Sequence, residues 1–394
     1  MSVFAAVMTG KGTGAISSVQ IFGDSAENII KKIFKSSGEK PPIFKPGVIC
    51  VGTISNGVET IDQVTIGCEG PTNFAINCHG NPLIVEMIMQ LLQRHEAELL
   101  TAEELLAKIL SAKKPTNTIT LEAKLAQPIA KTLEGTKIIA NQIDAGLNKT
   151  ATKWLQNINA IPLKEITAAA AKILRDSQTA KLVIAGCMAV IAGPPNTGKS
   201  TLLNYFCGRQ KAIVTDIKGT TRDWVSARCQ IGSLSVELID TAGLDEELAA
   251  TTQNVLAKKS QEKTTQVLEQ ADLVLLVLDN SQPIDQLDGR LIEKIAGKKV
   301  LTVLNKSDLP PKLDTAALPQ ILAKTVRISA KLGTGIEALI EKIRQICGLA
   351  DFNLQAEVCF TSRQKNLIKQ LKKAKSKKQA VSIITELLSG RLSV

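Results

Sequence analysis

Short strand-like runs alternate with longer polar or amphipathic stretches in the second half of the chain. The strand-like runs are residues 183–192, 235–240, 273–279, 300–305 and 325–329. A continuous apolar run bounded by turn residues is typical of a strand buried on both faces. Strands that alternate with amphipathic stretches are typical of a sheet covered by helices on both sides. The pattern therefore predicts a doubly wound α/β domain over residues 181–349.

The first 112 residues have a different pattern. Short apolar runs at 48–54 and 63–68 are separated by turn residues. Helix-like segments follow around Leu91, Leu99 and Leu105. This mixture predicts a small α+β domain over residues 1–112. The polar, proline-containing residues 111–118 are interpreted as a linker.

Helical spacing begins after this linker. Apolar residues recur at positions 121, 125, 129, 133, 139, 143 and 147, and only Pro128 and Gly135 interrupt them. The spacing predicts helices over residues 119–180, with the apolar face as packed core rather than a cofactor pocket. Residues 350–394 are predicted to form a basic helical segment. Its apolar side contains Ile368 and Leu371, and lysines 365, 369, 372 and 373 lie outside it.

Composition limits the class of protein. The chain has 394 residues, enough for about two to three domains, and 44% of its residues are hydrophobic. Only 3% are aromatic, so a nucleic-acid surface built from stacked rings is disfavoured and any RNA contact must depend on charge. The net charge is +11, and residues 361–394 hold nine Lys or Arg against Glu386 alone. This tail is either a solvated helix face or an RNA-facing patch.

The sequence shows no sign of a membrane protein. The longest uncharged stretch, residues 182–198, contains two Gly and two Pro before its last Gly, so it does not predict a membrane span. No basic segment precedes the short apolar run at the N-terminus, and a cytoplasmic location is expected. The eight cysteines are dispersed without a Cys-x-x-Cys pair, which predicts buried free thiols rather than a metal site.

The clearest chemical motif is the glycine-rich run that starts at Gly193 and ends Gly198-Lys199-Ser200, between a predicted strand and a predicted helix. Backbone N–H groups of such a loop cradle phosphate oxygens, Lys199 reaches the β- and γ-phosphates, and Ser200 holds Mg²⁺. The nucleotide-binding residues predicted here are Gly193, Asn196, Thr197, Gly198, Lys199, Ser200 and Thr201.

Two further motifs follow in the order that phosphoryl transfer requires. Thr220 or Thr221 can supply a second ligand to Mg²⁺, and Thr221 is the predicted catalytic one. Asp240 ends a predicted strand, where its carboxylate can hold the Mg²⁺ shell. Gly243 can sense the γ-phosphate through its N–H.

Asn305, Lys306 and Asp308 predict which base the bound nucleotide carries. The Asp308 carboxylate can accept both N1–H and N2–H of guanine, whereas adenine offers no N1–H and leaves it unpaired. Ser329 and Ala330 lie where a backbone N–H to guanine O6 is expected. GTP is therefore the predicted nucleotide.

The motifs together resemble those of the tRNA modification GTPases called MnmE or TrmE. The resemblance rests on Asn196 in the phosphate loop, on residues 213–223 and on residues 240–244, with weaker echoes at residues 9–23 and 78–82. It implies an α/β P-loop GTPase domain inserted in an α-helical domain and preceded by a small α+β N-terminal domain. The implied domains are 1–112, 119–180, 181–349 and 350–394.

The resemblance also implies partners and cofactors. Members of this family hydrolyse GTP, act on the wobble uridine of tRNA with a flavoprotein partner, and are homodimers through the N-terminal domain. In the family, the residue matching Asn196 and the backbone before Gly219 hold a K⁺ ion, which replaces an arginine finger when two GTPase domains meet. The alternative is that Asn196 only caps a turn.

Some positions depart from the family pattern. Where the family has a water-orienting Glu beyond Asp240, this chain has Thr251-Thr252-Gln253, so Gln253 is the candidate catalytic residue; otherwise it is a solvated polar residue. The folate motif has no counterpart between Arg94 and Thr120, which leaves 5-formyltetrahydrofolate open.

The end of the chain also differs. The family closes with a Cys two residues before Gly-Lys, whereas this chain closes with residues 389–394, Ser-Gly-Arg-Leu-Ser-Val. The expectation is a divergent and C-terminally reduced member of the family.

His79, beside a Gly-Asn-Pro turn, is interpreted as structural rather than as a ligand to folate or RNA. The alternative function is a non-catalytic, GTP-dependent switch or an RNA- or partner-binding paralogue that lacks modification chemistry.

Overall fold

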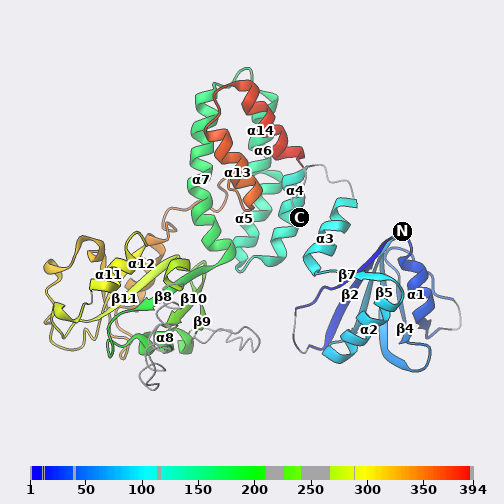
Figure 1. Cartoon of the computed structure of the whole chain (residues 1–394), viewed down its shortest axis with the longest axis horizontal. Coiled ribbons are helices and arrows are strands. Elements are labelled where there is room, and N and C mark those ends of the chain that lie inside the picture. Colours follow the sequence, from blue (N-terminus) through cyan, green and yellow to red (C-terminus); the bar gives the residue numbers. More distant parts are fainter. Residues whose placement is uncertain are drawn as a thin grey trace. The chain divides into compact units, whose positions relative to one another are not determined.

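The computed structural model of the chain describes residues 2–10, 12, 14–38, 41–112, 117–209, 226–240, 267–287 and 289–390 (Figure 1). It divides between Leu121 and Glu122 into two compact units.

The first unit is a mixed sheet with helices. Its elements are β1 Val3–Val7, β2 Ile16–Phe22, α1 Ala26–Ile33, β3 Phe34–Ser36, β4 Ile49–Ser55, β5 Thr60–Gly70, β6 Asn73–His79, α2 Pro82–Arg94, β7 Ala97–Leu99 and α3 Ala102–Ala112. The seven strands have the order β3-β4-β5-β6-β2-β1-β7, and only the β1–β7 pair is parallel. Buried side chains alternate along β2 and β5, and they form one core with apolar residues of α1 and α2. The predicted α+β domain is confirmed.

One predicted helix position in this unit is wrong. Leu99, expected to be helical, ends strand β7. Helix α2 stops at Arg94, and the chain reverses at Glu96, whose φ of 68° is left-handed. The Leu100 N–H then donates to the Ala5 carbonyl of β1 at 2.9 Å. The pairing with β1 therefore decides the conformation of this short apolar segment, whose local pattern is the same for a strand and a helix.

The second unit contains a group of helices from both ends of its sequence. They are α4 Thr118–Ala126, which begins in the first unit, η1 Gln127–Ile129, α5 Leu133–Asp144, α6 Gly146–Gln156, α7 Leu163–Ala185, α13 Ser362–Lys372 and α14 Lys377–Ser389. Helix α13 packs on α7, and α14 packs on α6 and α13 (Figure 1). The basic tail is thus two helices, because Thr361 and Ser376 each accept a hydrogen bond from an N–H of the following first turn.

Buried polar side chains fasten the tail to the earlier helices. Glu122 is 4% exposed, and its carboxylate accepts hydrogen bonds from Thr361, Arg363 and Gln364. Fully buried Gln142 accepts from the Val358 N–H at 3.1 Å and donates to the Ala356 carbonyl at 3.0 Å. The contacts join residues more than 200 positions apart in the sequence.

Between α7 and α13 the chain forms a second sheet. Its elements are β8 Cys187–Ala192, α8 Lys199–Arg209, β9 Ser226–Ile231, β10 Leu234–Asp240, β11 Leu273–Asp279, η2 Ile284–Gln286, α11 Gly289–Ile295, β12 Val300–Asn305, η3 Thr315–Ala317, η4 Gln320–Leu322, β13 Thr325–Arg327 and α12 Ile336–Ile346. The strand order is β13-β12-β11-β8-β10-β9, with only the β9–β10 pair antiparallel. Alternate residues of the central strands face two cores, one shared with α8 and α12 and the other with α11. The predicted doubly wound domain is confirmed.

The first strand of this domain starts later than predicted. Val183, expected to be in a strand, is the third-last residue of α7, and β8 begins at Cys187. Gly186 ends the helix with a φ of 84°. The apolar residues 182–184 are buried in the same core as residues of β8. Their apolar side chains therefore indicate that this segment is buried, but they do not indicate that it is a strand.

Two expectations from composition concern the whole chain. Seven of the eight cysteines are buried, Cys207 is half-buried, and all eight are free thiols, as predicted. Within the described residues, no helix has both the length and the apolar character that a membrane span requires.

Candidate nucleotide-binding site

The glycine-rich loop 193–198 lies at the carboxyl end of β8, in the middle of the sheet. Strand β8 is hydrogen-bonded to β11 on one side and to β10 on the other. The chain thus continues from β8 to β10 on one side of it and then crosses to β11 on the other side, so the strand order reverses at β8. Doubly wound sheets bind ligands in the crevice at such a point. Helix α8 starts at Lys199, so its N-terminus faces the loop.

The loop backbone depends on left-handed residues. Gly193, Asn196 and Gly198 have φ of 145°, 60° and 91°. A Cβ on Gly193 would collide with the Val277 carbonyl oxygen of β11, and one on Gly198 would collide with the Asn305 amide. Asn is among the few non-glycine residues that adopt this conformation readily. Left-handed turns of this kind are typical of anion-binding loops, in which backbone N–H groups line a concavity.

Lys199 and Thr197 are held within this loop. The Lys199 ammonium donates to the carbonyls of Gly193 and Pro194 at 2.9 and 2.8 Å, and the residue is only 4% exposed. The Thr197 hydroxyl donates to the same Pro194 carbonyl at 3.0 Å. One positive charge is therefore kept beside the N–H groups of the loop.

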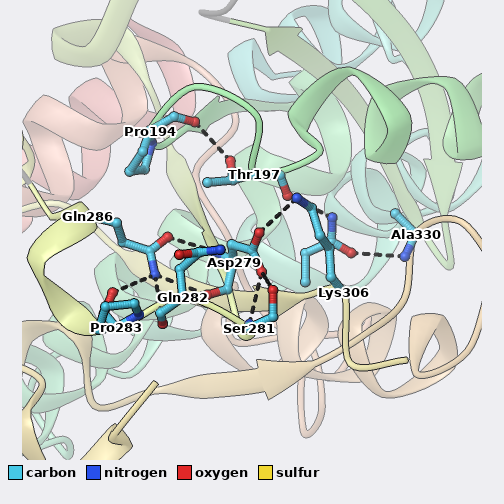
Figure 2. A network of polar contacts seen from close by, with 10 residues as sticks. Pro194, Thr197, Asp279, Ser281, Gln282, Pro283, Gln286, Lys306 and Ala330 are labelled. Carbon is cyan, nitrogen blue, oxygen red and sulfur yellow. Dashed lines mark hydrogen bonds and ion pairs between the residues drawn. The ribbon is translucent and has the colours of Figure 1, made fainter. Parts of the chain in front are cut away.

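Asn305 connects three loops at the end of the sheet. Its Nδ2 donates to the Thr197 carbonyl at 2.8 Å, and its Oδ1 accepts from the Ala330 N–H at 2.9 Å. Figure 2 shows this bridge between Thr197 and Ala330. Asn305 is 3% exposed and ends β12. The side chain thus fixes the distance between the phosphate loop and the 329–330 segment.

Asp308 and Ser329 lie together on the same side. The Ser329 hydroxyl donates a hydrogen bond to the Asp308 carboxylate, which lowers the pKa of that carboxyl. The Ser329 N–H is bonded to the Thr334 carbonyl at 3.0 Å and the Ala330 N–H to Asn305. The Ala330 N–H already donates to the Asn305 side chain. If it also contacted guanine O6, it would have to donate to both oxygens.

Lys306 has a partner that the motif did not indicate. Its ammonium lies 2.7 Å from the Asp279 carboxylate, which also accepts from the Ser281 hydroxyl at 2.6 Å (Figure 2). Burial disfavours ionisation of Asp279, but the bonds from Lys306 and Ser281 outweigh it, and the pKa of this carboxyl is lowered. Gln286 encloses Asp279 further by accepting from its N–H and donating to its carbonyl.

Asp279 could have been found in the sequence. It is the last residue of the otherwise apolar strand β11, which pairs with β12 so that Asp279 lies opposite Asn305. A polar residue at the carboxyl end of a buried parallel strand is the available signal.

The remaining predicted residues are placed only in part. Ser200 and Thr201 are exposed in the first turn of α8. The backbone of Asp240 ends β10 opposite Ile191 of β8. Thr220, Thr221, Gly243, residues 251–252 and Gln253 lie outside the described residues, as does the side chain of Asp240.

The described part of the site can bind a purine nucleoside polyphosphate. Loop N–H groups, a lysine and a helix N-terminus are arranged for phosphates, and a charged carboxylate lies at the far end of the Asn305 bridge for a base with N–H donors.

Family models match both units. The model described as 50S ribosome-binding GTPase matches residues 188–306, and the model described as GTP-binding protein TrmE N-terminus matches residues 3–105. The tRNA modification GTPase MnmE of Lacticaseibacillus paracasei is 30% identical over 94% of this chain and 86% of its own length. The chain belongs to the MnmE family. The MnmE protein of Ligilactobacillus salivarius is 31% identical over 91% of this chain and 83% of its own length.

Membership of the MnmE family makes the protein a GTP-hydrolysing enzyme. Among solved structures, the G domain of the T. maritima FeoB iron transporter is 28% identical and covers 41% of this chain and 98% of that chain, with a TM-score of 0.32.

The segment matched by the TrmE model contains His79, which the structure ties to Asp62. The His79 N–H donates to one Asp62 oxygen at 2.8 Å, and its ring Nδ1 lies 2.7 Å from the other. Asp62 is 8% exposed. In this MnmE-family chain His79 therefore binds the end of β6 to Asp62 of the neighbouring strand β5.

Proposed function

We propose that this protein binds GTP between the loop 193–198 and the 305–308 and 329–330 segments, and hydrolyses it in the modification of tRNA at the wobble uridine. The observation that carries the proposal is the Asn305 bridge, because it joins the phosphate-binding loop to the loop expected to recognise the base. The relatives named as tRNA modification GTPases support the RNA substrate.

The proposed chemistry is phosphoryl transfer to water. Negative charge spreads over the γ-phosphoryl oxygens in the transition state, so fixed donors at those oxygens lower the barrier. The donors we assign are the backbone N–H groups of Asn196, Thr197 and Gly198 and the Lys199 ammonium. Thr221 and Gln253 are the proposed positioning groups for the metal and the water.

The proposed metals are Mg²⁺ and K⁺. Ser200, Thr221 and Asp240 would hold Mg²⁺, which prefers such oxygen donors and screens the phosphate charge. Asn196 would contribute its amide oxygen to K⁺. The exposed position of Asn196 in the loop, where its backbone is already left-handed, supports this assignment.

Potassium dependence gives a direct test of the Asn196 assignment. GTP hydrolysis should be faster in KCl than in NaCl at equal ionic strength, and Asn196→Ala should remove the difference. The control is Asn141→Ala, which changes a half-buried asparagine on α5, and this variant should keep the difference. A wild-type rate that is equal in the two salts would refute the potassium site.

The base assignment is tested by exchanging hydrogen-bonding groups. Asp308→Asn should weaken GTP binding and strengthen XTP binding, since an amide can donate to the O2 that xanthine has in place of the guanine amino group. Binding of fluorescent GTP, XTP and ATP is measured by titration, with Asp314→Asn as an exposed control. Equal affinity of the wild type for ATP and GTP would contradict the assignment.

The biological role is tested by nucleoside analysis. A strain lacking this gene should lose the modified wobble uridine, and the wild-type gene, but not the Lys199→Ala gene, should restore it. Unchanged wobble uridine in the deletion strain would refute the role in modification while leaving GTP hydrolysis unaffected.

The proposed architecture follows the packing of α13 on α7. We assign 1–112 to the N-terminal domain, 181–349 to the GTPase domain, and 119–180 with 350–394 to a helical domain into which the GTPase is inserted. The proposed partners are tRNA, a flavoprotein and a second copy of the chain. The proposal leaves out 5-formyltetrahydrofolate, because residues 94–120 contain no folate motif.

A further inference from the structure

A groove of about 550 Å³ lies between α7 and α13 in the second unit. Helix α7 lines it with Ala171, Leu174, Arg175 and Gln178. Helix α13 lines it with lysines 365, 369 and 372, together with its C-cap residue Lys373. Each set recurs at helical spacing, so each comes from one face of its helix. The two faces meet because α13 packs against α7 (Figure 1).

The lining is positively charged and contains no carboxylate. Arg175 and the four lysines are exposed, whereas Leu174 and Ala171 are half-buried. The apolar floor suits the methylene stems of lysine and arginine, which leaves the charged ends at the mouth. Five like charges beside one another repel, so an anionic occupant is favoured.

Other cations of the same tail have roles within the fold. Arg363 is 13% exposed in its side chain and pairs with Glu122 at 2.9 Å, and Lys377 donates to the Asn159 carbonyl at 2.8 Å. Part of the tail charge therefore holds helices together, and another part lines the groove.

The dimensions of the cluster indicate the kind of anion. Residues 365 and 373 are eight positions apart, which corresponds to about 12 Å along a helix. One phosphate group cannot contact ammonium groups spread over that length, whereas a chain of phosphates can. Lysines contact phosphates as point charges without reading bases, so such a contact positions RNA rather than selecting its sequence.

We propose that the α7–α13 groove binds the phosphate backbone of tRNA. The inference rests on the proposed function, because a tRNA-modifying GTPase must hold its RNA substrate. An acidic protein is the rival occupant, but the groove lining has no aromatic side chain of the kind that anchors protein interfaces.

The test uses the full-length protein and an unmodified tRNA transcript with uridine at the wobble position. Binding is measured by fluorescence anisotropy between 50 and 300 mM KCl. The groove variant changes lysines 365, 369, 372 and 373 to Gln. The control variant changes lysines 149, 153, 375 and 378 to Gln, which removes the same charge at exposed positions outside the groove.

The groove variant should lower the slope of log affinity against log salt by about 3, because each lost phosphate contact removes roughly 0.7 to 0.9. Its affinity at 100 mM KCl should fall at least tenfold, whereas the control should keep most of the wild-type slope. Arg175→Gln should lower the slope by about one. Lys369→Gln with Lys373→Gln provides a milder variant if the fourfold change prevents folding.

Three results would overturn the assignment. Equal losses of tRNA affinity and of salt slope in the groove and control variants would show that binding depends only on the net charge of the protein. If neither variant changed the affinity or the salt slope of tRNA binding, the RNA would bind at another surface of the protein. Groove-dependent binding of polyglutamate without binding of tRNA would identify an acidic protein as the occupant. GTP hydrolysis measured on the same samples tests the proposed function separately, since no groove residue lies in the nucleotide site.

Discussion

Removal of the Asn305 side chain should separate the phosphate loop from the 329–330 segment. Asn305→Ala leaves the Thr197 carbonyl and the Ala330 N–H without their partner, and both bonds are buried. An unsatisfied buried group costs about 1 to 3 kcal/mol, so the local free energy of opening should fall by about 2 to 6 kcal/mol. Even the lower figure raises the population of the open state roughly 30-fold.

Hydrogen exchange of the full-length protein measures this local opening. Amide exchange at Ala330 should become at least about 30-fold faster in Asn305→Ala, and GTP affinity should fall with it. Asn305→Asp keeps the acceptor for the Ala330 N–H but removes the donor to Thr197, so it should preserve protection at Ala330 and still weaken GTP binding.

The control is Asn141→Ala on α5, which removes one exposed bond from the Asn141 amide to the Gln355 carbonyl and should leave exchange at Ala330 unchanged. Wild-type exchange at Ala330 together with wild-type GTP affinity in Asn305→Ala would refute the bridge as the link between the two loops.

Three further changes test other parts of the fold. Arg363→Ala should lower the free energy of unfolding by about 3 to 5 kcal/mol in urea titrations, since Glu122 would stay buried without a cation, and Glu122→Gln in the same chain should recover part of the loss. Gly193→Ala should abolish binding of fluorescent GTP, because a Cβ would meet a carbonyl oxygen of β11, whereas Gly208→Ala, with open space around it, should bind normally. Because the pKa of Asp279 is lowered by folding, its contribution is complete above the ordinary value of 3.8 and is lost as the pH falls below it; urea titrations from pH 5 to pH 3 should therefore show a smaller loss of stability in Asp279→Asn than in the wild type.

Strands β11 and β12 of the sheet that carries the site were predictable because they are buried on both faces. The runs 273–279 and 300–305, which are apolar except for Thr302 and the closing residues Asp279 and Asn305, have the same bounds as β11 and β12. A largely apolar run that closes on a polar residue leaves little freedom in where a strand starts and ends. Val183 shows the limit of this argument, since the same apolar character continues from the end of α7 into β8 across a single glycine.

The polar connections of the site were less accessible from the sequence. Lys306 belongs to a motif, but its partner Asp279 lies 27 positions earlier and reaches it only through the pairing of β11 with β12. The bond between Asn305 and Ala330 likewise depends on how two loops meet at one edge of the sheet. Local patterns identify which residues carry chemistry, whereas their partners follow from the topology.

The 241-residue separation between Glu122 and Arg363 has a consequence for the order in which the protein is made. At roughly 5 to 20 residues per second, a ribosome needs about 12 to 48 s to reach Arg363 after it has added Glu122. During that time α4 to α7 exist without α13, and the Glu122 carboxylate lacks its partners Thr361, Arg363 and Gln364. The intervening nucleotide-binding sheet can fold in the meantime, so assembly of the helices waits for the last part of the chain to leave the ribosome.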